Sequence, residues 1–139
     1  MSEQKRIVRR HFQEIFNDKR GGGGTAGIWA DRITNFGRTM SRDDLGRIFD
    51  ALLETFPDWE FTVDHIIEEG DWVATFGIVR GTYRAARFPP FADIEPRGQR
   101  IEWRHMHWFR VEAGCIVEHF AVRDDLAVRA QLMAAPPAA

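Results

Sequence analysis

Apolar residues recur every three or four positions in two stretches near the start of the chain. Within residues 3–17 they form one stripe, and charged residues fill the opposite side. Residues 41–56 repeat this spacing, with Ser41 placed to cap the first turn and Pro57 placed to end the helix. We therefore predict two amphipathic helices, each of which buries one face.

The segment between these helices is predicted to be irregular. The four glycines at 21–24 are expected to form a flexible linker. A phosphate-binding loop is excluded there, because it would need a lysine followed by serine or threonine after the glycines. Residues 25–31 are expected to form a short helical turn.

After Pro57 the apolar spacing changes to two, which is typical of half-buried strands. Four strands are expected, at residues 59–67, 72–84, 100–111 and 115–122. Residues 124–133 begin with two acidic residues and favour a final helix. Helices followed by two antiparallel hairpins indicate an α+β fold, with the helices against one face of the sheet.

The composition fits one globular domain over residues 1–139, with a short disordered tail at 134–139. The formal net charge is −2, which argues against nucleic acid as the main partner. No apolar run approaches the length needed to span a membrane, so no membrane partner is expected. The single cysteine, Cys115, cannot form an internal disulfide, and we expect a cytoplasmic protein.

Three of the five histidines, His105, His107 and His119, fall in the last two predicted strands. A two-residue turn between these strands would need positive φ at an alanine, whereas a three-residue loop at 112–114 needs it only at a glycine. With that loop His107 lies opposite His119, His105 lies opposite Ala121, and opposed residues share a face. We therefore predict a histidine cluster on one face of the sheet.

This cluster has three interpretations. It can perform acid–base chemistry in a pocket, since the ordinary pKa of histidine suits proton transfer near neutral pH. It can also be a set of polar residues in a wet cavity without chemistry. The spacing resembles a metal site as well. However, no carboxylate is expected beside the histidines, and we expect no metal.

The chain resembles the SnoaL-like polyketide cyclase family, within the nuclear-transport-factor-2-like superfamily. The matching segments are FN at 16–17, FPDWEF to RGTY at 56–83, and PRGQRIEW to RDDL at 96–126. The resemblance implies a cone-shaped α+β barrel, in which N-terminal helices pack in a curved, mostly antiparallel sheet around a deep pocket. It also implies no organic or metal cofactor and a homodimer or higher homo-oligomer.

In this family an aspartate is expected to remove a proton between two carbonyls, two residues after the histidine of an EH motif. Here that position is Ala121, which cannot accept a proton. The resemblance places His107 and His119 among the pocket histidines, and His105 is the candidate replacement base. Further substrate-binding candidates line the expected pocket wall: Trp29, Asn35, Phe61, Tyr83, Trp103, Phe109 and Ala121. Gly77 is expected to widen that pocket.

The sequence therefore predicts a cofactor-independent enzyme of the cyclase, isomerase or lyase type. It would act on a small, apolar, polyketide-like carbonyl compound in secondary metabolism, by proton transfer and intramolecular ring closure. The missing aspartate keeps two alternatives open. One is a non-catalytic small-molecule-binding module. The other is a pericyclic cyclase, dehydratase or hydroxylation component of the same fold. The sequence does not identify the substrate, the ring formed or its stereochemistry.

Overall fold

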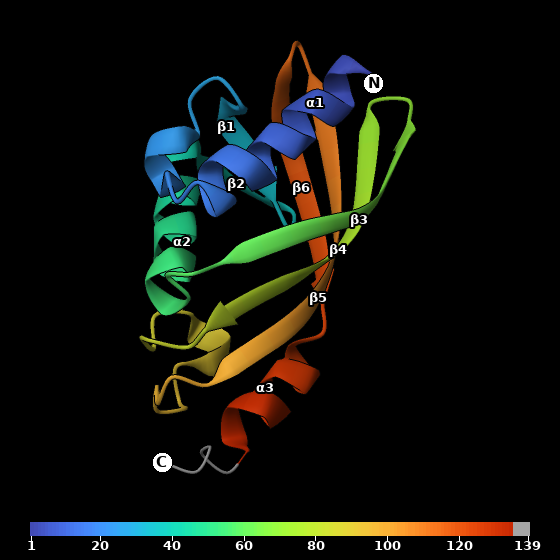
Figure 1. The fold of residues 1–139 in the computed structure, drawn as a ribbon. Coiled ribbons are helices and arrows are strands. Elements are labelled where there is room, and N and C mark those ends of the chain that lie inside the picture. Colours follow the sequence, from blue (N-terminus) through green and yellow to red (C-terminus); the bar gives the residue numbers. More distant parts are fainter. Residues whose placement is uncertain (135–139) are drawn as a thin grey trace.

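The computed structural model describes residues 1–134, and its framework is one curved six-stranded sheet (Figure 1). The strands are β1 Trp29–Asn35, β2 Arg38–Ser41, β3 Glu60–Glu69, β4 Trp72–Thr82, β5 Arg100–Glu112 and β6 Cys115–Arg123. They lie in the order β2-β1-β6-β5-β4-β3, and only β1 and β6 are parallel. The predicted α+β class with a mostly antiparallel sheet is confirmed.

Helices cover one face of this sheet and one of its ends. The helical elements are α1 Glu3–Arg10, the π-helix η1 His11–Asn17, the 3₁₀ helices η2 Gly21–Gly24 and η3 Pro89–Phe91, α2 Arg42–Thr55 and α3 Asp125–Met133. In Figure 1, α1 crosses the same side of the sheet on which α2 lies, and α3 lies at the opposite end from the N-terminus. In the described part of the chain, no helix combines the length and apolar character needed to cross a membrane.

The helix starts follow from the sequence. The Ser41 hydroxyl accepts a hydrogen bond from the Asp44 N–H at 3.0 Å, and the Asp124 carboxylate accepts one from the Ala127 N–H at 3.1 Å. These side chains satisfy backbone donors that a helix start leaves unpaired. The predicted second and final helices are therefore confirmed. The predicted tail lies outside the described residues except for Ala134.

The tetraglycine segment differs from its prediction as a flexible linker. It forms the 3₁₀ helix η2, and its Gly22 N–H donates to the Asp50 carboxylate on α2 at 2.8 Å. A Cβ atom on Gly46 of α2 would lie only 3.0 Å from Gly22 Cα. The glycines thus allow two backbones to pack closely, which side chains would prevent. The helical turn predicted at 25–31 is also wrong, because β1 begins at Trp29.

The turn between β5 and β6 is shorter than predicted. Ala113 and Gly114 form a two-residue turn with φ of +50° and +78°, and Glu112 pairs with Cys115 across it. Positive φ at both central residues is the type I′ pattern, whose twist matches that of the flanking strands. This match offsets the steric cost at the alanine, so the predicted three-residue loop is wrong.

A bulge in β6 then shifts the register again. Val111 pairs with Ile116 but Arg110 pairs with Glu118, which leaves Val117 as the extra residue. Beyond the bulge, the pairing differs from the predicted one by two residues. Because side chains alternate with a period of two, the same residues still face inward.

Gly77 on β4 serves a different purpose from the one predicted. A Cβ atom there would overlap the Thr62 carbonyl oxygen and lie 2.6 Å from Phe61 Cζ. The neighbouring strand β3 is bulged nearby, between Val63 and His65. Gly77 therefore makes room for the β3 backbone and the Phe61 ring, and it does not widen a pocket.

Candidate active site

Three histidines meet on the inner face of the sheet. His105 and His107 project from β5, and His119 projects from β6. His105 Nδ1 lies 3.0 Å from His107 Nε2, and His107 Nδ1 lies 2.8 Å from His119 Nε2. The predicted cluster is confirmed, although its register was wrong, since His107 lies opposite Ala121 and not opposite His119.

Asn35, the last residue of β1, sets the direction of this row. We call Asn35, His119, His107 and His105 the histidine relay. Asn35 Oδ1 lies 2.8 Å from His119 Nδ1 and can only accept, so His119 donates from Nδ1. A neutral imidazole that donates from one nitrogen accepts at the other, so His107 and His105 also donate from Nδ1. His105 is thereby left with a lone pair on Nε2.

The Nε2 atom of His105 is buried and has no hydrogen-bond partner within the described residues. The other five ring nitrogens of the three histidines are paired along the relay. Within residues 1–134, no group of three or more His, Cys, Asp or Glu side chains is arranged to hold a metal ion. The relay therefore presents one free basic atom at one end.

Burial keeps the relay histidines neutral. His105 is 3% exposed, and His107 and His119 are 8% exposed. Removal from water disfavours the charged imidazolium. It lowers the pKa of His105 and His107 well below the usual 6.5, and it is the main reason why the pKa of His119 falls to about 3. At neutral pH the lone pair of His105 is therefore available.

Arg123, the last residue of β6, places a positive charge beside the relay. It lies directly opposite His105 in the β5–β6 register. Its guanidinium carbon lies 5.2–5.9 Å from the centres of three aromatic rings, those of Phe36, Phe88 and Trp103. Its ion pair with Asp125 is long, at 3.6 Å. After burial, the charge of Arg123 is the next cause that lowers the pKa of His105 and His119.

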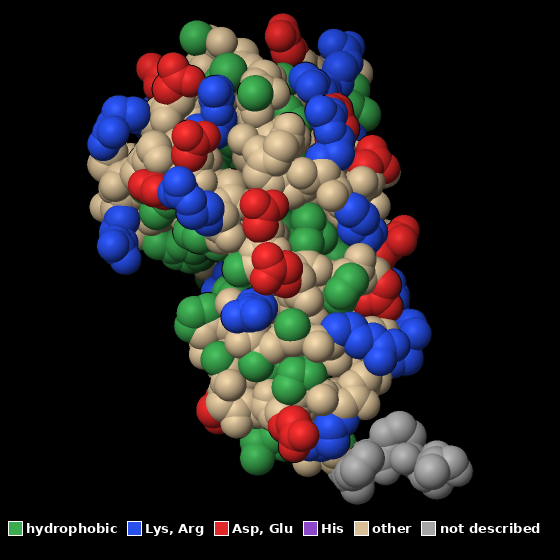
Figure 2. Space-filling model, turned by 90° about the vertical axis from the view of Figure 1, so that its left-hand side faces the viewer, with side chains coloured by type: hydrophobic (Ala, Val, Ile, Leu, Met, Phe, Trp, Pro, Cys, Tyr) green, Lys and Arg blue, Asp and Glu red, His purple; other side chains and the backbone are tan. Residues whose placement is uncertain are grey.

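The relay and Arg123 line an interior cavity of about 60 Å³. This is about the volume that two water molecules occupy in the liquid. Apolar and aromatic side chains form most of the remaining wall: Phe12, Phe16, Phe36, Ile48, Phe49, Leu52, Trp59, Phe88 and Trp103. Of these, Phe36 is 45% and Ile48 is 38% exposed, so they mark the mouth of the cavity. Figure 2 views the side on which α2 lies, and no histidine is visible at that surface.

A family model for SnoaL-like polyketide cyclases matches residues 7–132, which is nearly the whole chain. The chain belongs to the SnoaL-like polyketide cyclase family. Among curated proteins, none matches it significantly. The family assignment therefore rests on the family model.

Solved structures of similar fold include three bacterial proteins. The chain is 25% identical to AclR, a proposed hydroxylase from Streptomyces galilaeus, with a TM-score of 0.78 and coverage of 98% of this chain and 99% of AclR. It is 24% identical to IdmH, a proposed polyketide cyclase from Streptomyces antibioticus (TM-score 0.77, coverage 94% and 99%). A proposed polyketide cyclase from Acidithiobacillus ferrooxidans is 19% identical (TM-score 0.84, coverage 97% and 97%). These similarities confirm the cone-shaped α+β fold.

Ala121 is where this member of the SnoaL-like family departs from the expected aspartate. It is half-buried on β6, directly opposite His107. Its methyl group cannot accept a proton, and it does not line the cavity. Any proton acceptor in this cavity must therefore be another residue.

The predicted wall residues divide into two groups. Asn35 and Trp103 line the cavity. Trp29, Phe61 and Phe109 lie behind the lining, in the aromatic core. Trp29 Nε1 donates to His11 Nδ1 at 3.0 Å, the Phe109 ring stacks on His107 with centres 5.6 Å apart, and the Phe61 ring lies 5.9 Å from His105. This second group holds the histidines in place from behind.

Tyr83 holds a loop in place and does not lie at the cavity wall, where the sequence predicted it. It is fully buried and is not part of the cavity wall. Its hydroxyl lies 2.7 Å from the Phe91 carbonyl oxygen and 2.8 Å from the Ile94 carbonyl oxygen. This hydroxyl therefore anchors the loop after β4 and is not free to stabilise an oxyanion.

Among the cavity residues that the sequence reasoning missed, three carry polar side-chain atoms: His11, Trp59 and Arg123. Arg123 continues the inward alternation of His119 and Ala121, so a signal existed. Trp59 precedes Phe61 by two residues and shares its alternation. His11 lies within the first predicted helix, but its contact with the cavity depends on how that helix packs.

Proposed function

We propose that the cavity promotes proton transfer on a small carbonyl compound and thereby ring closure. His105 Nε2 is the base. The observation that carries the proposal is its unpartnered buried lone pair, held in that state by Asn35 through two intervening histidines. Membership of a polyketide cyclase family supports the reaction class and a small polyketide as the substrate.

In the proposed reaction, one proton moves from the substrate to His105 and then from His105 to the product. His105 Nε2 takes a proton from a carbon beside a carbonyl, and the C–H electron pair forms an enolate. The enolate carbon attacks a second carbonyl of the same molecule, which forms a C–C bond and moves the carbonyl electrons onto oxygen. The resulting alkoxide takes the proton from His105. A buried imidazolium returns its proton readily, because its pKa is low.

The weak basicity of His105 must be offset by stabilisation of the enolate. Arg123 supplies the nearest positive charge, and its side chain lines the same cavity as His105. Its partner Asp125 lies at the long distance of 3.6 Å, so the guanidinium keeps donors for a substrate oxygen. Charge stabilisation inside a dry site is stronger than in water.

The cavity must open before a polyketide enters. Its volume of about 60 Å³ is below the roughly 150 Å³ of a cavity that binds benzene, and ligand sites for larger molecules measure roughly 300–1,000 Å³. Phe36 sits at the tip of the β1–β2 turn, with φ of +52°, and Ile48 lies on α2. We propose that these two exposed side chains move aside during entry.

Hydrogen–deuterium exchange at carbon tests the proposed base. Phenylacetone, one aromatic ring with a CH₂ group beside a carbonyl, is incubated with the protein in D₂O and followed by proton NMR. The protein should speed the loss of the CH₂ signal above that in buffer. His105→Phe keeps a ring of similar shape but removes the base, so the rate should fall by about 100-fold or more. Arg123→Gln should also slow the exchange.

Two further variants control this experiment. His65→Phe replaces an exposed histidine on β3 and should leave the rate unchanged. Ala121→Asp in the His105→Phe background supplies the carboxylate expected in the family and should restore part of the rate. A wild-type rate equal to that of buffer, or a full rate in His105→Phe, would contradict the assignment of His105.

A second candidate function is binding without catalysis, or a part in hydroxylation. Ala121 favours both, because it removes the carboxylate expected for enolate chemistry. The 25% identity to AclR, named as a proposed hydroxylase, favours the second. Binding of phenylacetone without exchange would support this candidate over ring closure.

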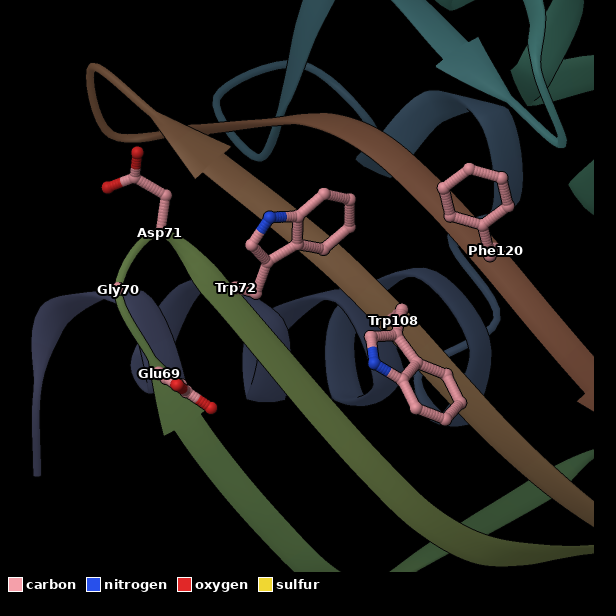
Figure 3. A pocket seen from close by; sticks show the side chains of 6 residues that line it. All are labelled: Glu69, Gly70, Asp71, Trp72, Trp108 and Phe120. Carbon is pink, nitrogen blue, oxygen red and sulfur yellow. The ribbon is translucent and has the colours of Figure 1, made fainter.

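We also propose a homodimer formed through the outer face of the sheet. Four apolar residues of β5 and β6 on this face are exposed by 39–66%: Met106, Trp108, Phe120 and Val122. Figure 3 shows Trp72, Trp108 and Phe120 on the side of the sheet turned away from α1. A contiguous exposed apolar patch of this kind is typical of a protein interface. A cytoplasmic location remains a prediction from composition.

A further inference from the structure

A second cavity residue carries a buried polar atom that lacks a partner. Trp59 precedes β3 and is 3% exposed, and its indole Nε1 has no hydrogen-bond acceptor within residues 1–134. The same ring packs on Phe16 with centres 4.9 Å apart and lies 5.9 Å from the His105 ring, at 77° to it. Trp59 and His105 therefore meet at the same part of the cavity wall.

The two unpartnered atoms have opposite hydrogen-bonding character. Trp59 Nε1–H can only donate. His105 Nε2 can only accept while the relay runs from Asn35. A buried polar group without a partner costs about 1–3 kcal/mol of folding free energy. Only one other described side-chain atom, Thr75 Oγ1, shares this state, and Thr75 does not line the cavity.

We propose that this donor and acceptor together form a subsite for a hydroxyl or enol oxygen. The oxygen accepts a hydrogen bond from Trp59 Nε1–H and donates its own proton to His105 Nε2. An enol, a phenol or the enol form of a ketone has this combination, whereas a simple ether or ester lacks the proton. The catalytic meaning of this substrate class rests on the proposed function, but binding at the subsite does not.

The surroundings suit a flat ring attached to that oxygen. Trp103 meets His105 edge-on with ring centres 4.4 Å apart, and aromatic side chains form much of the cavity wall. A cavity that binds benzene measures roughly 150 Å³, so this cavity of about 60 Å³ holds a ring once Phe36 and Ile48 have moved aside. Trp103 Nε1 already donates to the Asp125 carboxylate at 3.0 Å. It therefore contributes a wall and no free donor.

Binding of phenol and toluene to the full-length protein tests the subsite. The two probes are similar in size, but only phenol carries the hydroxyl. Each is titrated into the protein and followed by NMR chemical shifts. Two new hydrogen bonds should make phenol bind at least about tenfold more tightly than toluene. Comparing the two probes within each variant cancels changes in cavity shape.

Three variants assign the preference to its atoms. Trp59→Phe and His105→Phe should each lower the phenol-to-toluene preference by about fivefold, because each removes one hydrogen bond. Trp72→Phe, on the outer face of the sheet and away from the cavity, should leave the preference unchanged. Equal affinity for both probes, no saturable phenol binding, or an unchanged preference in Trp59→Phe would overturn the subsite.

The binding test is independent of the exchange test, because it measures the affinity for phenol and does not require removal of a proton from carbon. Selective phenol binding without phenylacetone exchange would keep the subsite and reject the proposed base catalysis. Exchange that depends on His105, together with a phenol preference that is unchanged in Trp59→Phe, would support the base catalysis and reject the subsite.

Discussion

At the scale of single residues, the site depends on how one amide orients three imidazoles. Asn35 Oδ1 accepts from His119 Nδ1, and this bond sets the protonated nitrogen of each histidine in turn. Replacement of the amide would remove the only fixed end of the row. The free lone pair of His105 is therefore a property of four side chains and not of His105 alone.

This arrangement makes a spectroscopic prediction. At neutral pH, His105, His107 and His119 should all carry their proton on Nδ1, and long-range nitrogen–proton NMR spectra distinguish this tautomer from the Nε2–H form. Asn35→Leu removes the acceptor, so the pattern should be lost first at His119. A folded wild-type protein with the Nε2–H form at His105 would contradict the direction of the relay.

The sequence predicted that the three histidines lie on one face of the sheet, but it did not show which neighbouring residues belong to the site. A strand alternates with a period of two, so an error of two residues in register left His105, His107 and His119 on one face. Arg123 shares that alternation, yet a charge at a strand end is ordinarily solvated. The unpaired nitrogen of Trp59 depends on packing against η1, which no local pattern encodes.

At the scale of elements, the long periodic segments were predicted and the short strands were not. The helices at 3–17 and 41–56 and the strands after Pro57 carry strong amphipathic patterns. β1 was missed because one of its partners, β6, lies 84–87 residues further along the chain in a parallel pairing, and the other, β2, has only four residues. Its following turn has a phenylalanine, Phe36, at positive φ, which is unusual for a bulky residue.

The contact between β3 and β4 gives a prediction at this scale. Gly77→Ala should lower the free energy of unfolding by about 1–3 kcal/mol or more, because the new methyl group would overlap the Thr62 carbonyl oxygen. Urea denaturation measures the loss. Gly23→Ala is the matched control, since no atom lies within 4 Å of its added Cβ. Equal stability of the two variants would refute the close approach.

At the scale of the whole molecule, four buried histidines make stability depend on pH. Burial lowers the pKa of His11, His105 and His107 well below 6.5 and that of His119 to about 3. The unfolded chain binds protons more readily than the folded protein. The histidines therefore leave the free energy of unfolding at its full value above about pH 6.5, and they lower it as the pH decreases. Each histidine loses about 1.4 kcal/mol per pH unit below that value.

We therefore expect acid unfolding to begin well above the range in which carboxylates titrate. Since domains are stable by only about 5–15 kcal/mol, the fold should be lost near pH 5. Denaturation at several pH values should reveal uptake of more than about three protons on unfolding at pH 5.5. His105→Phe should lower this number by about one. His65→Gln is the control, because it changes an exposed histidine and removes no buried one. Uptake of a single proton would disagree with four neutral buried histidines.

The outer face of the sheet gives a second prediction for the whole molecule. If the proposed dimer forms through β5 and β6, Trp108→Lys should place a charge in the interface and yield a monomer. Light scattering after size-exclusion chromatography measures the mass. Met133→Lys, at an exposed position on α3, should leave the dimer intact. A wild-type monomer at all concentrations would reject the interface.

The relay is open at His105 and closed at Asn35, and this asymmetry restricts the chemistry that it can serve. An amide oxygen does not carry a proton onward, so a proton that enters at His105 has no exit at the other end of the row. It must leave through the atom by which it came. Such a site favours isomerisations and ring closures, in which substrate and product hold the same atoms. Reactions that need a proton to cross the row to a second acceptor at its far end cannot use it.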